Sequence, residues 1–137
     1  MALNCFQRAI AVATNETLSD VYYNIGHVAV SIGDLALAYQ CLKIAISSDG
    51  NHAESFNNLG VLEMRKGNLG QAKSNFRQAA KLSLYLFEPC FNAAFLMFRN
   101  GEFKESFEMV EKALELFPEH EDSKQLKRNL QKHLTQM

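Results

Sequence analysis

The sequence predicts an all-α protein, a right-handed α-solenoid of helix-turn-helix repeats with a C-terminal capping helix. Three observations predict it. The chain of 137 residues is 47% hydrophobic and holds only two prolines, a composition that can build a core from long helices. Three blocks of the chain align when the sequence is shifted by 34 residues. Each block has two stretches of helical periodicity separated by glycine.

Residues of matching type coincide at five positions of this period. The sets are Asn24, Asn58 and Asn92; Gly33, Gly67 and Gly101; Ala45, Ala79 and Ala113; Gly26, Gly60 and Ala94; and Ala38, Ala72 and Ser106. The glycine after the first stretch fits a hairpin turn, because glycine adopts a left-handed backbone at little cost. The small residues within the stretches fit close contact between two helix axes. We therefore expect each block to be a hairpin of two packed helices.

The aligned blocks set the boundaries of the expected units. These units are residues 1–18, 19–52, 53–86, 87–120 and 121–137. The first unit looks like the second helix of an incomplete repeat, and its apolar face would be left open. We expect such a helix to support a dimer or a domain swap. In the last unit Leu126, Leu130 and Leu134 form one apolar stripe, which predicts a capping helix.

A helix-turn-helix period of 34 residues, with these registers and Pro118 near the end of the third block, resembles the tetratricopeptide repeat family. The sequence departs from the family pattern at a few positions. Cys90 stands where an aromatic residue is usual, Gly50 and Leu84 where proline is common, and Glu63 where a large apolar residue is typical. The resemblance implies a non-catalytic scaffold that binds other proteins.

Two segments, 20–34 and 52–67, resemble more narrowly the C-terminal repeats of tetratricopeptide repeat subunits of the BBSome, the Bardet–Biedl syndrome complex. This resemblance implies a role in carrying membrane proteins into and out of cilia and in cilium assembly. It also implies other BBSome subunits as partners, and a place in the cytoplasm, at the basal body and in the cilium. Two alternatives remain open. The chain could be a peptide-binding cochaperone or cargo adaptor, or the regulatory domain of an enzyme whose catalytic part lies elsewhere.

The first helices of stacked hairpins line the concave face of a solenoid, so their outward positions are the candidate binding site. The predicted partner-binding residues are Tyr23, Asn24, His27, Asn57, Asn58, Val61, Arg65, Phe91, Asn92, Phe95 and Arg99. Asn24, Asn58 and Asn92 would form a ladder of amides that can pair with an extended peptide backbone. Alternatively, these asparagines pair within their own hairpins.

A second feature of this face is its aromatic and charged content. Phe91, Phe95 and Phe98 share one helical stripe, which is either core or an anchor for a partner. Only Arg65 and Arg99 are basic at the predicted concave positions, whereas three acidic residues occupy one register. The acidic residues are Asp20, Glu54 and Glu88. This balance disfavours a clamp for a C-terminal carboxylate.

Several functions are excluded by what the sequence lacks. The net charge of -1 gives no electrostatic footprint for nucleic acid, and no run of 18 apolar residues predicts insertion into a membrane. Cys5, Cys41 and Cys90 lie far apart and predict no disulfide. The four histidines have no metal-ligand spacing, and no nucleotide-binding or nucleophile motif occurs. We therefore expect no enzyme activity, no metal and no cofactor.

Overall fold

The computed structural model describes residues 15–135, and within them it contains seven α-helices and no strand. The helices are α2 (Asn15–Ile32), α3 (Leu35–Ser48), α4 (Ala53–Lys66), α5 (Leu69–Leu82), α6 (Glu88–Arg99), α7 (Phe103–Leu116) and α8 (Glu121–Thr135). Helix α2 begins four residues before the expected start at Ser19. The helix predicted before it, and the dimer or domain swap expected through that helix, lie outside the described residues.

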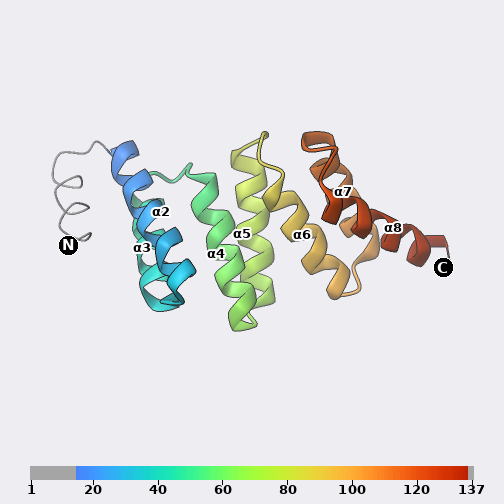
Figure 1. The fold of residues 1–137 in the computed structure, drawn as a ribbon, viewed down its shortest axis with the longest axis horizontal. Helices are drawn as coiled ribbons and strands as arrows, with labels where there is room; N and C mark the ends of the chain where they lie inside the picture. The colour runs from blue at the N-terminus through green and yellow to red at the C-terminus, as the bar shows by residue number, and fades with distance from the viewer. Residues whose placement is uncertain (1–14, 136–137) are drawn as a thin grey trace.

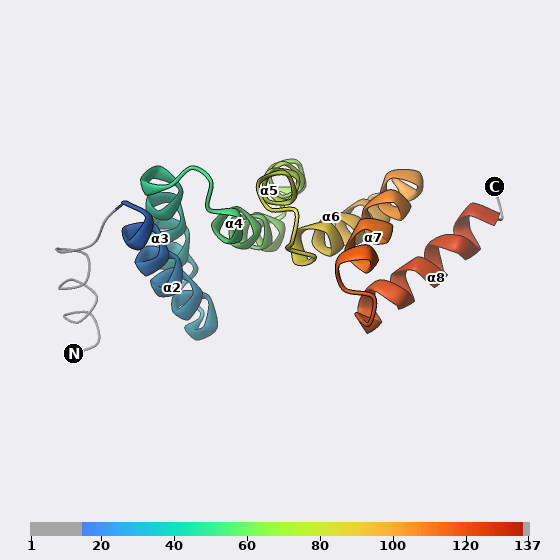
Figure 2. The same ribbon diagram turned by 90° about the horizontal axis from the view of Figure 1, so that it is seen from above.

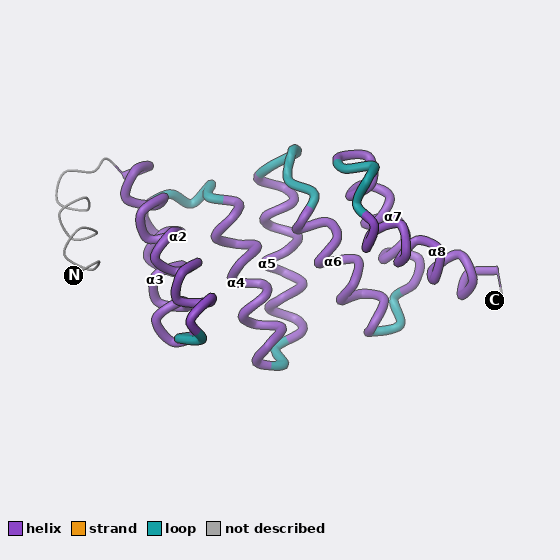
Figure 3. Tube along the Cα trace, viewed as in Figure 1, coloured by secondary structure: helices purple, strands orange, loops and turns teal. Residues whose placement is uncertain are grey.

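Consecutive helices pair into three antiparallel hairpins, which stack side by side into an arch (Figures 1 and 2). We call α2–α3, α4–α5 and α6–α7 the first, second and third hairpins. Short loops join the helices (Figure 3). Helices α2, α4, α6 and α8 follow one another along the inner side of the arch, each in contact with the next. This is the predicted solenoid, with α8 covering its C-terminal end.

Each hairpin turns at a left-handed glycine, as the sequence predicts. Gly33, Gly67 and Gly101 have φ values of 84°, 87° and 81°. The turn also satisfies carbonyls at the end of the first helix. In the first hairpin the Asp34 N–H donates to the Ala29 carbonyl at 2.9 Å. An L side chain at these glycines would be strained, so the turn fixes the residue type.

The small-residue register brings the two helices of each hairpin together. A Cβ added to Gly26 would lie 3.1 Å from Leu42 Cγ, and one added to Gly60 would lie 2.5 Å from the Phe76 ring. In the third hairpin Ser106 Oγ donates to the Ala94 carbonyl at 2.6 Å. The expected close approach of helix axes is therefore confirmed.

Between the hairpins lie three apolar clusters. The first centres on Leu42, Leu59 and Leu62, and the second centres on Phe76, Leu96 and Met97. The third joins Ala94 and Val110 to Leu126 and Leu130 of α8. Burying one such leucine or phenylalanine side chain stabilises the fold by about 1.5–3 kcal/mol. Because each cluster spans two units, no hairpin buries its apolar face alone.

Candidate protein-binding site

All of the predicted binding residues lie on α2, α4 and α6, the helices that line the inner side of the arch. None of them is fully buried. The exposed residues are Asn24, His27, Arg65, Phe95 and Arg99, and the half-buried ones are Tyr23, Asn57, Asn58, Val61, Phe91 and Asn92. The face is thus a rigid helical surface with mixed polar and aromatic side chains.

On this face, an asparagine of the repeated register forms a hydrogen bond between neighbouring hairpins. Asn92 Nδ2 on α6 donates to Asn57 Oδ1 on α4 at 3.0 Å. One repeat earlier, the Asn58 side chain on α4 lowers the pKa of the Tyr23 hydroxyl on α2. Asn92 therefore pairs with the residue that precedes the asparagine of the same register in the previous hairpin. The expected alternative of pairing within a hairpin is wrong for Asn92.

Tyr23 lies in an acidic part of the face. Burial raises the pKa of the Tyr23 hydroxyl above its usual value, the Asn58 hydrogen bond lowers it, and the charges of Glu54 and Glu88 raise it further. The hydroxyl therefore stays protonated at neutral pH and remains a donor. Carboxylates around a neutral donor favour a partner that brings amide N–H groups or positive charge.

His52 makes contacts between α2 and α4 that the sequence did not predict. Its side chain is only 8% exposed, and Nε2 lies 2.8 Å from Asp20 Oδ1. Nδ1 lies 2.8 Å from Ser55 Oγ, and the ring packs 5.1 Å from the Tyr23 ring. The imidazole thus joins α2 to the start of α4 and fixes the position of Tyr23.

The sequence repeats the pair of His52 and Ser55, and this repetition could have indicated their contact. His120 and Ser123 repeat the pattern of His52 and Ser55 two periods later, and His120 Nδ1 lies 2.6 Å from Ser123 Oγ. In both cases a histidine precedes a helix and its ring nitrogen faces a serine in the first turn. His120 Nδ1 also accepts from the Ser123 backbone N–H at 3.3 Å, whereas the His52 side chain makes no such bond to the backbone of α4.

The aromatic stripe of α6 divides between core and surface. Phe91 is half-buried and meets the His120 ring edge-on, with centroids 5.0 Å apart. Phe98 packs against Phe103 with centroids 5.6 Å apart. Phe95, by contrast, is 38% exposed, and the Arg99 guanidinium lies 5.8 Å from its ring centroid. Phe95 is therefore the aromatic side chain that a partner can reach.

The described part of the chain offers no other obvious chemistry. Among residues 15–135, no cluster of three or more His, Cys, Asp and Glu side chains could hold a metal ion. No helix in that range has the length and hydropathy needed to cross a membrane. Cys41 and Cys90 are free and buried, and burial raises the pKa of both thiols.

Comparison with known proteins identifies the class. The tetratricopeptide repeat family model matches residues 19–52 and 53–84, so the chain contains tetratricopeptide repeats, as its periodicity predicts. Two solved structures show the same fold. The Arabidopsis OM64 TPR domain superposes with a TM-score of 0.80 at 20% identity, over 87% of this chain and 98% of its own. The first TPR of Spaghetti (RPAP3), bound to the HSP90 peptide SRMEEVD, gives 0.82 at 17% identity, over 90% and 98%.

Nearer relatives share one name. The chain is 42% identical over 131 residues to Tetratricopeptide repeat protein 8 of Homo sapiens, which covers 95% of this chain and 24% of that protein. It is 40% identical over 129 residues to the protein of the same name in Caenorhabditis elegans, over 94% of this chain and 26% of that protein. The chain thus spans about a quarter of the length of the curated relatives it matches.

Proposed function

We propose that this chain is a non-catalytic scaffold that binds other proteins on its concave face, as part of a BBSome-like complex in ciliary membrane-protein trafficking. The observation that carries the binding role is the inner face itself. The inner helices α2, α4 and α6 hold Asn24, His27, Arg65, Phe95 and Arg99 open to solvent, and the Asn92–Asn57 hydrogen bond joins α6 to α4. A rigid surface with an accessible aromatic group suits protein recognition.

The ciliary part of the proposal rests on sequence similarity. Segments 20–34 and 52–67, which resemble BBSome subunits, form most of α2 and α4 on the binding face. The similarity to Tetratricopeptide repeat protein 8 extends over 95% of the chain and so includes that face. On this basis the partners are other BBSome subunits, and the chain works in the cytoplasm, at the basal body and in the cilium.

The alternative of a cochaperone that binds acidic tails fits the face less well. Asp20, Glu54 and Glu88 place three carboxylates in one register of the inner helices. The peptide bound by the first TPR of Spaghetti ends in the acidic sequence EEVD. Carboxylates repel such a tail, and Arg65 and Arg99 lie at the far ends of their helices.

The proposal is tested with Phe95→Asp, which places a charge on the exposed aromatic of α6. The parent chain and the variant are each co-expressed with individual BBSome subunits, and recovery is measured by affinity capture. We expect the variant to lose at least about tenfold in affinity for the subunit that the parent captures, and to keep its helicity by circular dichroism.

The matched control is Leu69→Asp, which makes the same chemical change at a 44% exposed side chain on α5. This control should bind like the parent. Equal binding by Phe95→Asp would remove the concave face from the proposal. Capture of chaperones or unrelated cargo, with no BBSome subunit, would favour the cochaperone or adaptor alternative.

A further inference from the structure

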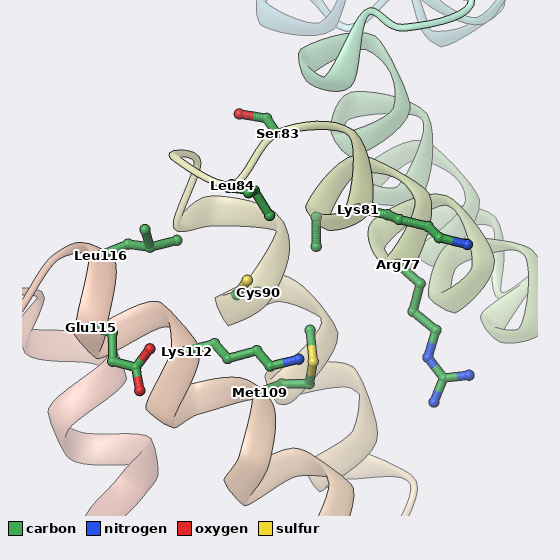
Figure 4. Close-up of a pocket in the computed structure, with 10 residues that line it drawn as sticks. Arg77, Lys81, Ser83, Leu84, Cys90, Met109, Lys112, Glu115 and Leu116 are labelled. Carbon is green, nitrogen blue, oxygen red and sulfur yellow. The ribbon is translucent and has the colours of Figure 1, made fainter.

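A groove of about 680 Å³ lies on the other side of the arch, between the second helices α5 and α7 (Figure 4). Apolar side chains make most of its lining, and they come from α5, the following loop, α6 and α7. They are Ala80, Leu84, Cys90, Met109 and Leu116. Lys81 borders it from α5, and Lys112 and Glu115 border it from α7.

The repeat explains why there is space here. Tyr22, Phe56 and Cys90 occupy one register of the three hairpins, so the third hairpin has a thiol where the first two have an aromatic ring. Cys90 is 5% exposed and lines the groove. A cysteine side chain fills far less volume than a phenylalanine, and the groove lies at this position.

The loop beside the groove exposes apolar groups. Residues 83–87 join α5 to α6, and within them Leu84 is 75% exposed and Tyr85 is 90% exposed. The equivalent loop of the first hairpin reads Asp-Gly-Asn-His, the polar composition that turns ordinarily have.

The end of α7 extends the same apolar surface. Leu116 is 38% exposed and Phe117 is 41% exposed. The Phe87 and Phe117 rings, 4.9 Å apart, bring this end of α7 against the loop. A contiguous exposed apolar patch of this kind marks an interaction surface.

The charged side chains at the margin of the groove indicate the chemistry of its partner. Lys81 and Lys112 are exposed and form no ion pair within residues 15–135, whereas the nearby Arg77 is bound to Glu105 at 2.8 Å. One repeat earlier the same registers hold Ser47 and Gln78. The two ammonium groups are thus specific to the junction that has the groove. Together they outweigh the one carboxylate of the lining, Glu115, so the margin complements carboxylates on a ligand.

We propose that this groove docks an acidic-hydrophobic segment of a partner protein. One aliphatic or aromatic side chain of the segment fills the space above Cys90, and flanking Asp or Glu residues pair with Lys81 and Lys112. The surface is separate from the concave face, so a single chain can hold two partners, or two parts of one partner, on opposite sides of the solenoid.

The test begins with a library of random 12-residue peptides displayed on phage and selected against the whole 137-residue chain. Enriched peptides are synthesised with a fluorescent label, and their Kd values are measured by anisotropy. We expect sequences that combine Leu, Ile, Phe or Met with at least two acidic residues. Binding should fall at least about tenfold with Cys90→Phe, which restores the aromatic residue of the other hairpins, and by a similar factor with Lys81→Glu/Lys112→Glu.

Two controls locate the site. Lys104→Glu/Lys132→Glu makes the same change in net charge at exposed lysines outside the groove lining and should leave Kd unchanged. Phe95→Asp on the concave face should also leave it unchanged, which separates this proposal from the preceding one. If Cys90→Phe lowers helicity, the lysine pair alone decides the outcome.

The proposal is overturned if the selection enriches no peptide, or if the enriched peptides bind both groove variants as well as the parent. Self-association of the parent that Leu84→Asp abolishes in sedimentation would assign the groove to a second copy instead. Binding to phosphatidylserine vesicles that depends on Lys81 and Lys112, with no peptide bound, would assign it to anionic lipid.

Discussion

The second and third hairpins have the same pair of facing positions, but the large and small side chains are divided differently between the two helices. In the second, Gly60 of α4 faces Phe76 of α5, and both are buried. In the third, Ala94 occupies the glycine position and the smaller Val110 the phenylalanine position, each 0% exposed. The third hairpin has a smaller side chain on its second helix and a larger one on its first helix. Side chains therefore fill the space between the helices in both hairpins.

The two hairpins also differ at the register of Phe56 and Cys90, and the smaller Cys90 lines the groove between α5 and α7. A compensated exchange inside a hairpin therefore keeps its two helices packed, whereas the exchange of an aromatic ring for a thiol coincides with a groove on the surface.

The largest effect is expected for Phe76→Ala. Phe76 is 0% exposed and packs over Gly60, so no Cβ on α4 can move in to fill the vacated space. We expect a loss of about 3–5 kcal/mol in the free energy of unfolding, measured by urea denaturation. Val110→Ala in the third hairpin, where Ala94 faces the site, should cost about 2 kcal/mol or less. Equal losses would break the comparison.

A smaller effect is expected for Gly60→Ala. The new methyl group would lie 2.5 Å from Phe76 Cε1, and overpacking of this kind costs about 1–3 kcal/mol, against about 1 kcal/mol gained in helix propensity. Gly26→Ala is the matched control, because its nearest contact is Leu42 Cγ at 3.1 Å, and we expect it to change the unfolding free energy little.

A double-mutant cycle sharpens this prediction. Phe76→Val, combined with Gly60→Ala, reproduces the residue pair of the third hairpin. The two substitutions should show a favourable coupling of about 1 kcal/mol or more in urea denaturation. Additive effects would mean that the size match between Gly60 and Phe76 does not govern the packing.

Much of the fold could be predicted from sequence because it depends on local spacing. The turns at Gly33, Gly67 and Gly101 and the contact of Gly60 with its hairpin partner follow from the 34-residue period alone. The same period placed the concave residues on the first helices. What these residues contact across hairpins depends on how one hairpin sits on the next, which periodicity does not encode.

Two findings show this limit. The Asn92–Asn57 bond crosses between hairpins. Cys90 was visible as a departure from the family pattern. Whether a groove forms beside such a departure is a property of packing between hairpins, and here Cys90 lines one.

The smallest effect is expected at the hydrogen bonds of Glu102 with Lys73 and Asn100, which we call the polar tie between the second and third hairpins. Lys73 Nζ on α5 donates to Glu102 Oε2 at 2.6 Å, and Asn100 Nδ2 donates to Oε1 at 2.7 Å. Both hydrogen bonds favour the carboxylate, and they hold the pKa of Glu102 below its usual value. In the first hairpin the same register holds Asp34, which instead caps its own helix by accepting from the Leu37 N–H at 3.1 Å.

Because the folded-state pKa of Glu102 is lowered, the tie contributes stability above the unfolded-state pKa of about 4.3, and that stability is lost as pH falls through the folded-state value. Glu102→Gln should lower the unfolding free energy at neutral pH by up to about 1 kcal/mol, and should then lose less stability than the parent on acidification. Glu108→Gln, at an exposed residue of α7 with no ion pair in the described chain, is the control and should follow the parent. If Glu102→Gln followed the parent at every pH, the tie would contribute nothing, and the second and third hairpins would be joined by their apolar cluster and the Asn92–Asn57 bond.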